Sequence, residues 1–462
     1  MDTKKLRQKI LDLAIRGKLV PQDPNDEPAS VLLERIRVEK ERLIKEGKIK
    51  RSKKSSSDTP HYENVPFEVP ESWEWTTIND ICSKIGSGST PRGSNYAEEG
   101  IPFFRSQNVY NDGLVYDDIK YISEEIHENM IGTEVRAQDL LLNITGGSLG
   151  RCAIVPDEFR KGNVSQHVCI LRTIVVLPAY LHLFIISDYF ASTMILSGSG
   201  REGLPKYSLE IMQIPLPPYE EQKRIVAAVE KWFTLIDTLE TAKADLQSSI
   251  TQAKSMILDI AIHGKLVPQD PNDEPAIELL KRINPKFSPC DNAHYENLPK
   301  GWTEINVGEL AQYTNGKAFQ PSDWEQRGLP IIRIQNLNDE NCKYNYTSIG
   351  HEEKYRITNG DLLFAWAASL GVYIWKGDDA WLNQHIFKVE PLPFIDRLFL
   401  YYLFQYLISE FYVRSHGSGM VHITKKEFET TIALLPPLSE QQRIVTSIKS
   451  YYTILDNISA NL

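Results

Sequence analysis

Residue types that could carry out catalysis are scarce in this chain of 462 residues. The segment "LPPY" at 216–219 differs from the D/N-P-P-Y/F motif that holds an amine for methyl transfer, because Leu216 stands where an Asp or Asn must accept a hydrogen bond. "PDEFRK" at 156–161 lacks the spacing of a nuclease PD…(D/E)xK motif, and "NGKAF" at 315–319 lacks the rest of a phosphate-binding loop. We therefore predict no catalytic residues. The first segment should end a strand before a helix, and the second should be a loop.

Six segments contain Gly and short polar residues, and all of them except 365–371 also carry Arg, Lys or His, which offers a different chemistry. Backbone N–H groups and short hydroxyls can bind phosphates, while the longer polar side chains can reach the edges of bases. Plain connecting loops are the alternative interpretation. The segments lie at 86–96, 143–151, 197–208, 314–324, 365–371 and 413–426.

Two Gln-His pairs, Gln166–His167 and Gln384–His385, lie in segments that we expect to be strands. A Gln side chain can bond an adenine with two hydrogen bonds. The alternative is a pair of structural residues whose hydrogen bonds are satisfied within the protein. The sequence leaves both interpretations open.

Composition restricts the class of protein. The formal net charge is −10, which by itself argues against nucleic-acid binding, although residues 34–54 hold ten Lys or Arg against four Glu. That stretch should begin as a helix and continue as a Lys/Ser linker. The five cysteines lie far apart, so we expect no zinc site, no other metal site and no disulfide framework. No apolar run reaches the roughly 18 residues of a membrane helix, and the first residues lack the apolar part of a signal peptide. We expect a cytoplasmic protein.

The elements that position these segments occur twice. "LDLAIRGKLVPQDPNDEP" at 11–28 and "LDIAIHGKLVPQDPNDEP" at 258–275 agree at sixteen of eighteen positions. "HYENVP" recurs as "HYENLP", "IPFFRSQNV" as "LPIIRIQNL", "SQHVCILR" as "NQHIFKVE", and "LPPYEEQKRIV" as "LPPLSEQQRIV". The chain is therefore two copies of one module.

A long helix is expected from about Tyr219 to Ile262, because its apolar residues recur in steps of three and four over about five heptads. Gly264 should cap it in the left-handed conformation, and Pro268 forbids its continuation. The C-terminus repeats the first half of this helix and the N-terminus the second half. The termini together make a split second copy, so the molecule is pseudo-circular.

The segments "GSGSTPRG…GIPFFRSQNV", "LNITGGSLGR…SQH", "IPLPPYEEQKRIV" and "AIRGKLVPQDPNDEPASVLLERI" resemble the specificity subunits of type I restriction–modification enzymes, over essentially the whole chain. The resemblance implies that each globular module is a target recognition domain for one half of a split, asymmetric double-stranded DNA sequence. It also implies two methyltransferase subunits and restriction/translocase subunits as partners, with no membrane. S-adenosylmethionine, ATP and Mg are then expected in those partners, and no cofactor in this chain.

The duplication sorts the candidate residues. Residues shared by both modules are assigned to structure or to contacts with the DNA backbone: Arg105, Gln107, Asn108, Gln166, His167, Arg333, Gln335, Asn336, Gln384 and His385. Base readout is placed in the divergent loops: Ser89, Arg92, Asn95, Thr145, Ser148, Arg151, Ser199, Arg201, Lys206, Lys317, Gln320, Trp366, Ser369, Arg414, His416, His422 and Lys425.

The predicted fold is α+β, with two repeated target recognition domains separated by two long antiparallel coiled-coil helices. The predicted boundaries are a helical segment and basic linker at 1–60, the first domain at 61–217, the central helix and linker at 218–293, the second domain at 294–437, and a C-terminal helix at 438–462 that pairs with the N-terminal segment. Two alternatives remain: a bivalent scaffold that binds proteins and no DNA, and a DNA-binding regulator that acts alone.

Overall fold

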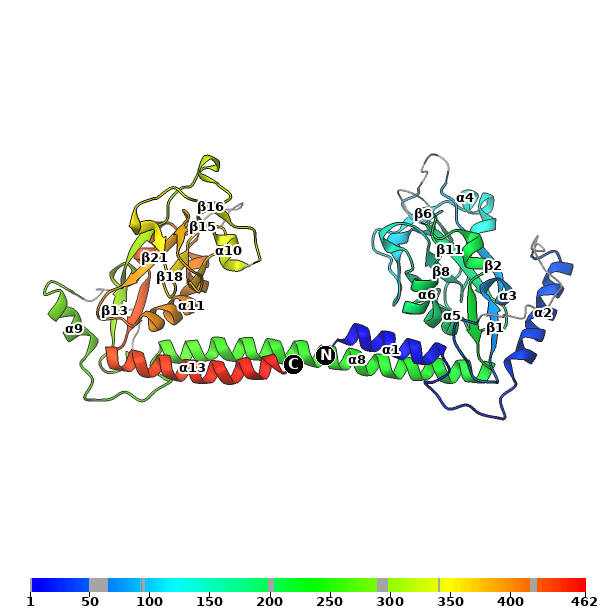
Figure 1. Ribbon diagram of the computed structural model, residues 1–462, viewed down its shortest axis with the longest axis horizontal. Coiled ribbons are helices and arrows are strands. Elements are labelled where there is room, and N and C mark those ends of the chain that lie inside the picture. The colour runs from blue at the N-terminus through cyan, green and yellow to red at the C-terminus, as the bar shows by residue number, and fades with distance from the viewer. Residues whose placement is uncertain are drawn as a thin grey trace. The chain divides into compact units, whose positions relative to one another are not determined.

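The chain folds into two compact units, Met1–Thr241 and Ala242–Leu462, in a computed structural model (Figure 1). The structure describes residues 2–49, 65–91, 93, 96–197, 203–288, 298–339, 341–415 and 422–462. The division falls inside helix α8 (Tyr219–Ile262), within the segment expected to be the central helix. The five finer boundaries stay predictions.

Unit 1 contains helices and short strands in alternation. Its helices are α1 (Thr3–Ile15), α2 (Ala29–Lys45), α3 (Ile78–Ile81), α4 (Glu124–Asn129), α5 (Pro178–Ile185), α6 (Asp188–Thr193), α7 (Lys206–Glu210) and the first part of α8, with short 3-10 turns η2 (Ser106–Asn108), η3 (Ile131–Thr133) and η4 (Gly146–Ser148). Its strands are β1 (Glu74–Thr77), β2 (Cys82–Ser87), β3 (Ile101–Phe104), β4 (Val109–Tyr110), β5 (Gly113–Leu114), β6 (Lys120–Ile122), β7 (Glu134–Val135), β8 (Leu140–Asn143), β9 (Cys152–Ile154), β10 (Gly162–Val164), β11 (Val168–Thr173) and β12 (Gln213–Leu216).

Unit 2 repeats this order of elements. Its helices are the rest of α8, α9 (Ala276–Ile283), α10 (Ile334–Asn338), α11 (Arg397–Val413), α12 (Lys425–Glu429) and α13 (Leu438–Ala460), with η5 (Val307–Glu309), η6 (Pro321–Asp323) and η7 (Glu353–Tyr355). Its strands are β13 (Thr303–Asn306), β14 (Ala311–Asn315), β15 (Leu329–Ile332), β16 (Asn345–Thr347), β17 (Arg356–Ile357), β18 (Leu362–Ala365), β19 (Gly371–Ile374), β20 (Ala380–Leu382), β21 (Ile386–Pro391) and β22 (Ile432–Leu435).

Three sheets of unit 1 match three sheets of unit 2 strand for strand, and unit 1 has a further two-stranded sheet, β4-β5. Unit 1 has sheets in the orders β1-β12, β6-β3-β10-β7 and β2-β11-β8-β9, and unit 2 has β13-β22, β16-β15-β20-β17 and β14-β21-β18-β19. In each unit the middle pair of the second sheet is parallel. This confirms the α+β class and the duplication.

Each unit contains an antiparallel pair of helices (Figure 1). In unit 1, Arg7 of α1 forms an ion pair with Asp237 of α8 at 2.5 Å, and Gln22, beyond the end of α1, bonds Glu221 at 2.7 Å. In unit 2, Ser459 of α13 bonds Gln247 of α8 at 2.9 Å. The expected pairing of the C-terminal helix with the N-terminal segment concerns both units together and stays a prediction.

The repeated helix ending is explained by its contacts. Gly17 and Gly264 both have φ in the left-handed region, at 65° and 68°. A Cβ on Gly17 would lie 2.4 Å from the ring of Pro70, and one on Gly264 would lie 2.5 Å from Pro299. At each of these two positions glycine is required for two reasons: the left-handed turn that ends the helix, and the close approach of a proline from the following module.

In each module, the segment that follows this glycine forms an ion pair with the first turns of a long helix, α8 in unit 1 and α13 in unit 2. Arg224 of α8 forms an ion pair with Asp26 at 2.6 Å, and the equivalent Arg443 of α13 pairs with Asp273 at 2.7 Å. Both aspartates lie in the repeated "PQDPNDEP" segment. The expected strand, prolines and helix order is confirmed, since β12 ends at Leu216 and α8 begins at Tyr219.

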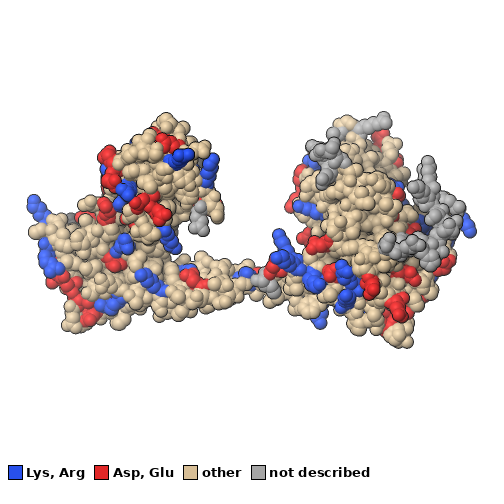
Figure 2. Space-filling view, in the orientation of Figure 1, with Lys and Arg blue, Asp and Glu red and all other residues tan. Residues whose placement is uncertain are grey.

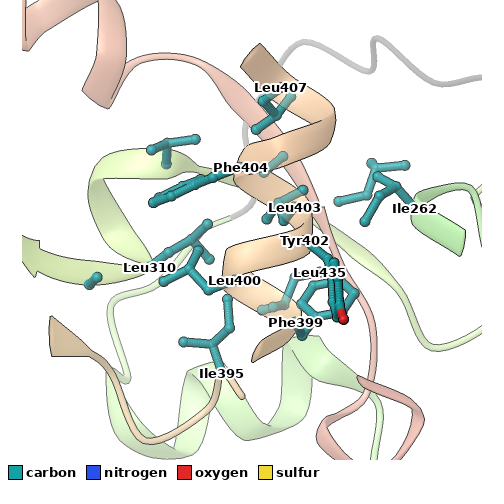
Figure 3. Close-up of a cluster of buried hydrophobic side chains, with 14 of the residues drawn as sticks. Ile262, Leu310, Ile395, Phe399, Leu400, Tyr402, Leu403, Phe404, Leu407 and Leu435 are labelled. Atoms are coloured by element: carbon teal, nitrogen blue, oxygen red, sulfur yellow. The ribbon is translucent and has the colours of Figure 1, made fainter. Parts of the chain in front are cut away.

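The core of unit 2 is built around α11, whose apolar side chains face several other elements (Figure 3). Phe399, Leu403 and Phe404 are fully buried there, together with Leu310. Ile262, at the end of α8, joins the same cluster. Burial of one such side chain contributes roughly 1.5–3 kcal/mol, so this cluster attaches the long helix firmly to the module.

The helical segment after β11 is broken into two helices, α5 and α6. The apolar pattern of residues 179–199 predicts one amphipathic helix that ends in a Gly/Ser loop, but α5 ends at Ile185 and α6 begins after Ser187. The Ser187 side chain accepts a hydrogen bond from the N–H of Phe190, and such a cap starts a new helix.

The basic stretch at 34–54 is helical in α2, where Arg42 pairs with Glu39 and Glu46, both at 2.6 Å. Its Lys/Ser continuation lies mostly outside the described residues.

Candidate nucleic-acid interface

Three of the divergent loops of unit 1 meet at one end of the sheet β2-β11-β8-β9. Strands β2 and β8 finish at this end and β11 begins there, because both pair with β11 in antiparallel fashion. The N–H of Ile144 donates to the carbonyl of His167 at 3.0 Å, and the N–H of Leu204 donates to the carbonyl of Ile144 at 2.8 Å. We call this loop cluster 1, made of residues 87–89, 143–145, 165–167, 197 and 203–204.

The same arrangement recurs in unit 2. The N–H of Trp366 donates to the carbonyl of His385 at 3.0 Å, and the N–H of Ile423 donates to the carbonyl of Trp366 at 3.0 Å. Lys317 forms a β-bridge with Asn383. We call this loop cluster 2, made of residues 315–317, 365–367, 383–385 and 422–423. The sequence placed candidate residues in all these loops, and the structure brings the loops together.

A glycine fixes each cluster by a close backbone approach. A Cβ on Gly88 would lie 1.8 Å from the carbonyl oxygen of Val164, and one on Gly316 would lie 2.0 Å from that of Asn383. Neither distance is compatible with a side chain, so only glycine lets these strands leave the sheet here. Ser89 and Lys317 follow these glycines and therefore occupy equivalent positions with very different side chains.

The side chains within the two clusters differ in their partners. In cluster 1, the Thr145 hydroxyl lies 2.8 Å from Nδ1 of His167. In cluster 2, the Lys317 ammonium lies 2.9 Å from Nδ1 of His351. His351 also packs edge-to-face against Phe319 at 5.0 Å. Burial, followed by the charge of Lys317, lowers the pKa of His351, which keeps this ring neutral near pH 7.

The other predicted base readers lie at varied places. Ser148 is in η4, and Arg151 stacks over the ring of Tyr110 at 4.8 Å. Three cations have acidic partners one helical turn away: Lys206 with Glu210, Arg414 with Glu410, and Lys425 with Glu429. Gln320 precedes η6, the N–H of Ser369 donates to the carbonyl of Ala367, and His422 forms a β-bridge with Ala367. Arg92, Asn95, Ser199, Arg201 and His416 lie outside the described residues.

The shared Arg-x-Gln-Asn residues occupy a tight turn in each unit. The side chain of Asn108 accepts from the N–H of Arg105 at 3.1 Å, and Asn336 does the same for Arg333 at 3.1 Å. Arg105 donates to the carbonyl of Asp118 at 2.7 Å. These contacts are those of structural residues. Gln107 and Gln335 are exposed beside them, and the amide of Gln107 donates to Asp118 at 2.9 Å.

The Gln-His pairs do not lie on strands, contrary to expectation. Gln166 and His167 form a turn before β11, and Gln384 and His385 form a turn before β21. β10 and β11 belong to different sheets, as do β20 and β21, and each Gln-His pair occupies the turn in which the chain passes from one sheet to the other. The exposed side chains of Gln166 and His167 thereby join loop cluster 1.

Sequence reasoning missed His351 and Asp118. His351 follows β16 and meets Lys317 only through the tertiary fold, 34 residues away in sequence. Asp118 accepts hydrogen bonds from both Arg105 and Gln107. The one signal for Asp118 was its position in a polar loop, which does not distinguish it from the neighbouring Asp117.

The described residues contain no group of three or more His, Cys, Asp or Glu side chains that could hold a metal ion. Burial raises the pKa of Cys82 and of Cys169 to about 12 each, so these thiols stay protonated near pH 7.

On the face shown in Figure 2, basic and acidic side chains are interspersed over each unit. Among the described helices, none is long and apolar enough to cross a membrane.

Comparison with known proteins gives a family. Residues 70–248 and 299–462 each match the type I restriction modification DNA specificity domain. The chain belongs to this family. The duplicated match agrees with the two units and with the resemblance seen in the sequence, and it does not favour either a protein-only scaffold or a regulator that acts alone.

Curated relatives of this specificity family extend over most of the chain. The EcoAI specificity subunit of Escherichia coli is 28% identical over 96% of this chain and 88% of its own. The EcoEI specificity subunit of Escherichia coli is 27% identical over 99% of this chain and 90% of its own. Both are named as subunits of type I restriction enzymes.

Solved structures show the same fold. A chain of a type I R-M system, from work on its complex assembly and conformational transition, aligns with a TM-score of 0.64 at 19% identity, covering 86% of this chain and 94% of that one. The HsdS subunit from Thermoanaerobacter tengcongensis aligns with a TM-score of 0.54 at 21% identity, covering 86% and 93%. The specificity-family fold therefore extends across both units.

Proposed function

We propose that this chain is the sequence-reading subunit of a type I restriction–modification enzyme. Each unit recognises one half of a bipartite, asymmetric double-stranded DNA target through its loop cluster. The observation that carries the proposal is the pair of clusters: the same backbone framework, with the same close-packed glycine, presents different side chains in each unit. Equal scaffolds with unequal contacts suit two half-sites of different sequence.

The long helices also support a proposal about partners. Trp232, Leu235 and Leu239 of α8 are 49%, 46% and 53% exposed, although they are large and apolar. Their equivalents on α13 are exposed as well: Tyr451 at 49%, Ile454 at 55% and Ile458 at 42%. We call these two sets the apolar stripes. Exposed apolar surface of this kind marks protein docking sites.

Two equivalent stripes support two equivalent methyltransferase subunits on each chain, with restriction/translocase subunits joining that core. Catalysis then belongs to the partners, which bind S-adenosylmethionine, ATP and Mg, and this chain supplies no catalytic group or cofactor site. The assembly acts where the DNA is, in the cytoplasm. The partners also contribute positive charge around the DNA, which offsets the net charge of −10 on this chain.

The test is an exchange of one module. Residues 294–437 are replaced by the equivalent domain of another specificity subunit, and the chain is produced with its methyltransferase partner. Sequencing of the host's methylated positions should show one half of the recognised sequence changed and the other half and the spacer kept. A change in both halves together, or no site-specific methylation with the parent chain, would refute the proposal.

A further inference from the structure

We propose that Thr145 with His167 in unit 1, and Ala367 with His385 in unit 2, form a specificity-determining pair for each half-site. This inference rests on the function proposed above and assigns part of the base readout to a particular histidine. The two histidines were assigned from the sequence to the shared residues, because both modules contain them.

The two histidines occupy equivalent positions within their own units. Each follows a glutamine in the turn that leads into the central strand, β11 or β21. Each backbone carbonyl accepts a hydrogen bond of 3.0 Å from the residue that follows the neighbouring strand, Ile144 in unit 1 and Trp366 in unit 2. The fold therefore presents an imidazole at the same point of both loop clusters.

The residue that follows Ile144 in unit 1 and Trp366 in unit 2 differs between the two units. In unit 1 it is Thr145, whose hydroxyl lies 2.8 Å from Nδ1 of His167. The hydroxyl fixes the ring and leaves Nε2 as the nitrogen directed to other partners. The amide nitrogen of Gln166 lies 3.5 Å from Nε2 of His167, which is too long for a strong hydrogen bond.

In unit 2 the equivalent residue is Ala367, which has no hydroxyl. Nδ1 of His385 is buried and has no hydrogen-bond partner among the described residues. The imidazole ring packs edge-to-face against the indole of Trp366 instead, with the ring centroids 4.7 Å apart. The indole N–H of Trp366 in turn donates a 3.0 Å hydrogen bond to the side-chain oxygen of Asn315. The same histidine is thus held by a hydroxyl in one module and by an indole in the other.

His385 also has an unusual backbone, with φ at 73°. A non-glycine residue in the left-handed region is strained, and such residues cluster at functional sites. His167 has no positive φ. The shared turn therefore differs in strain, in the support of the ring and in the partner of Nδ1.

The chemistry of imidazole turns these differences into specificity. A neutral histidine has one donor and one acceptor nitrogen, and the bond made by one nitrogen decides the role of the other. Base edges in the major groove differ in where they place donors and acceptors. The Thr145 hydroxyl can donate to Nδ1 or accept from it, so it can support either tautomer of His167, whereas Nδ1 of His385 has no such partner among the described residues. The two outer nitrogens therefore differ in how readily they can serve a donor or an acceptor on a base.

Reciprocal substitutions test this. Thr145→Ala removes the hydroxyl from unit 1, and Ala367→Thr introduces it into unit 2. Each variant of the full chain is produced with its methyltransferase partner, and methylated positions in the host DNA are sequenced. Each should change the base preference at one or more positions of a single half-site, by roughly 5- to 150-fold in relative methylation, and the two variants should affect opposite half-sites.

Two control variants separate this role from a structural one. Thr193→Ala makes the same chemical change at a hydroxyl that bonds only carbonyls of its own helix, Tyr189 and Phe190, and should leave both half-sites unchanged. Thr145→Ser keeps the hydroxyl and should keep the original preference.

An unchanged preference in both reciprocal variants, or an equal fall in methylation at all sequences, would overturn the inference. The same holds if Thr145→Ser behaves like Thr145→Ala. Failure of the unmodified chain to direct methylation at a bipartite site would instead refute the proposed function, and this inference with it.

Discussion

The indole N–H of Trp73 donates to the buried carboxylate of Glu221 over 3.0 Å. These residues lie 148 positions apart, in the strand-leading segment of the first module and in the first turn of α8. Trp302 and Glu440 form the same 3.0 Å bond in unit 2. The bond joins each module to the long helix that follows it, and Gln22 and Gln269 add a second donor to each carboxylate.

Replacing Trp73 with Phe should destabilise unit 1. The variant keeps most of the ring but leaves one carboxylate oxygen of Glu221 without its donor, and an unsatisfied buried polar atom costs about 1–3 kcal/mol. Chemical denaturation followed by circular dichroism measures the loss. Trp302→Phe is the matched variant in unit 2 and should cost a similar amount. No loss in either variant would show that the bond contributes nothing to stability.

The two carboxylates should also make stability depend on pH. Burial raises the pKa of Glu221 and of Glu440, more than their donors lower it. A folded-state pKa above the unfolded value means that the folded protein binds the proton more tightly. These groups therefore add to the free energy of unfolding as the pH falls from 7 through their folded pKa values, and this gain is complete below the ordinary glutamate value.

The measurement compares the parent chain with the double variant Glu221→Gln/Glu440→Gln between about pH 4.5 and 7. The free energy of unfolding of the parent, minus that of the variant, should increase toward acid pH. A difference that is flat, or that decreases toward acid pH, would contradict the raised pKa values.

The loop clusters should depend on their close-packed glycines. Gly88→Ala places a Cβ where the carbonyl oxygen of Val164 lies 1.8 Å away, so the backbone must move and recognition of one half-site should be lost. Gly86→Ala, two residues earlier, meets nothing within 4 Å and serves as the control. Methylation at variants of the target distinguishes them. Equal behaviour of both variants would mean that cluster 1 does not require this approach.

The apolar stripes should each bind one methyltransferase subunit. Leu235→Asp places a charge in one stripe and Ile454→Asp in the other, and a desolvated charge opposes docking. Native mass spectrometry of the co-produced assembly should find one methyltransferase subunit for either single variant and none for the double variant. Val38→Asp, on an exposed apolar residue of α2, should still bind two. Two bound subunits in the double variant would place the docking surface elsewhere.

Much of the architecture could be predicted because it is written in local patterns. The bounds of α8 follow from its apolar period and from the prolines that precede it and the glycine that follows it. The left-handed conformation at Gly17 and Gly264 follows from the same helix endings. The duplication, visible as repeated segments, implied two modules of the same fold, and three sheets recur in both units.

Other features depend on packing between distant segments. The break at Ser187 was not predicted, because apolar period alone does not show that a serine side chain will cap a new helix there. The Gln-His pairs were assigned to strands, because a turn between two short strands has no period that marks where the strand begins. The role of Asp118 required knowing which arginine it would face.

The sequence by itself determined that the protein is two copies of one module joined by long helices, because periodicity and repetition are properties of the chain. Only the tertiary structure decided which side chains meet: Trp73 with Glu221, and Thr145 with His167. Such pairs lie far apart along the chain, and their distance is set by how sheets and helices pack. The same shared histidine consequently has a hydroxyl partner in one module and none in the other, since the residue that packs against it differs.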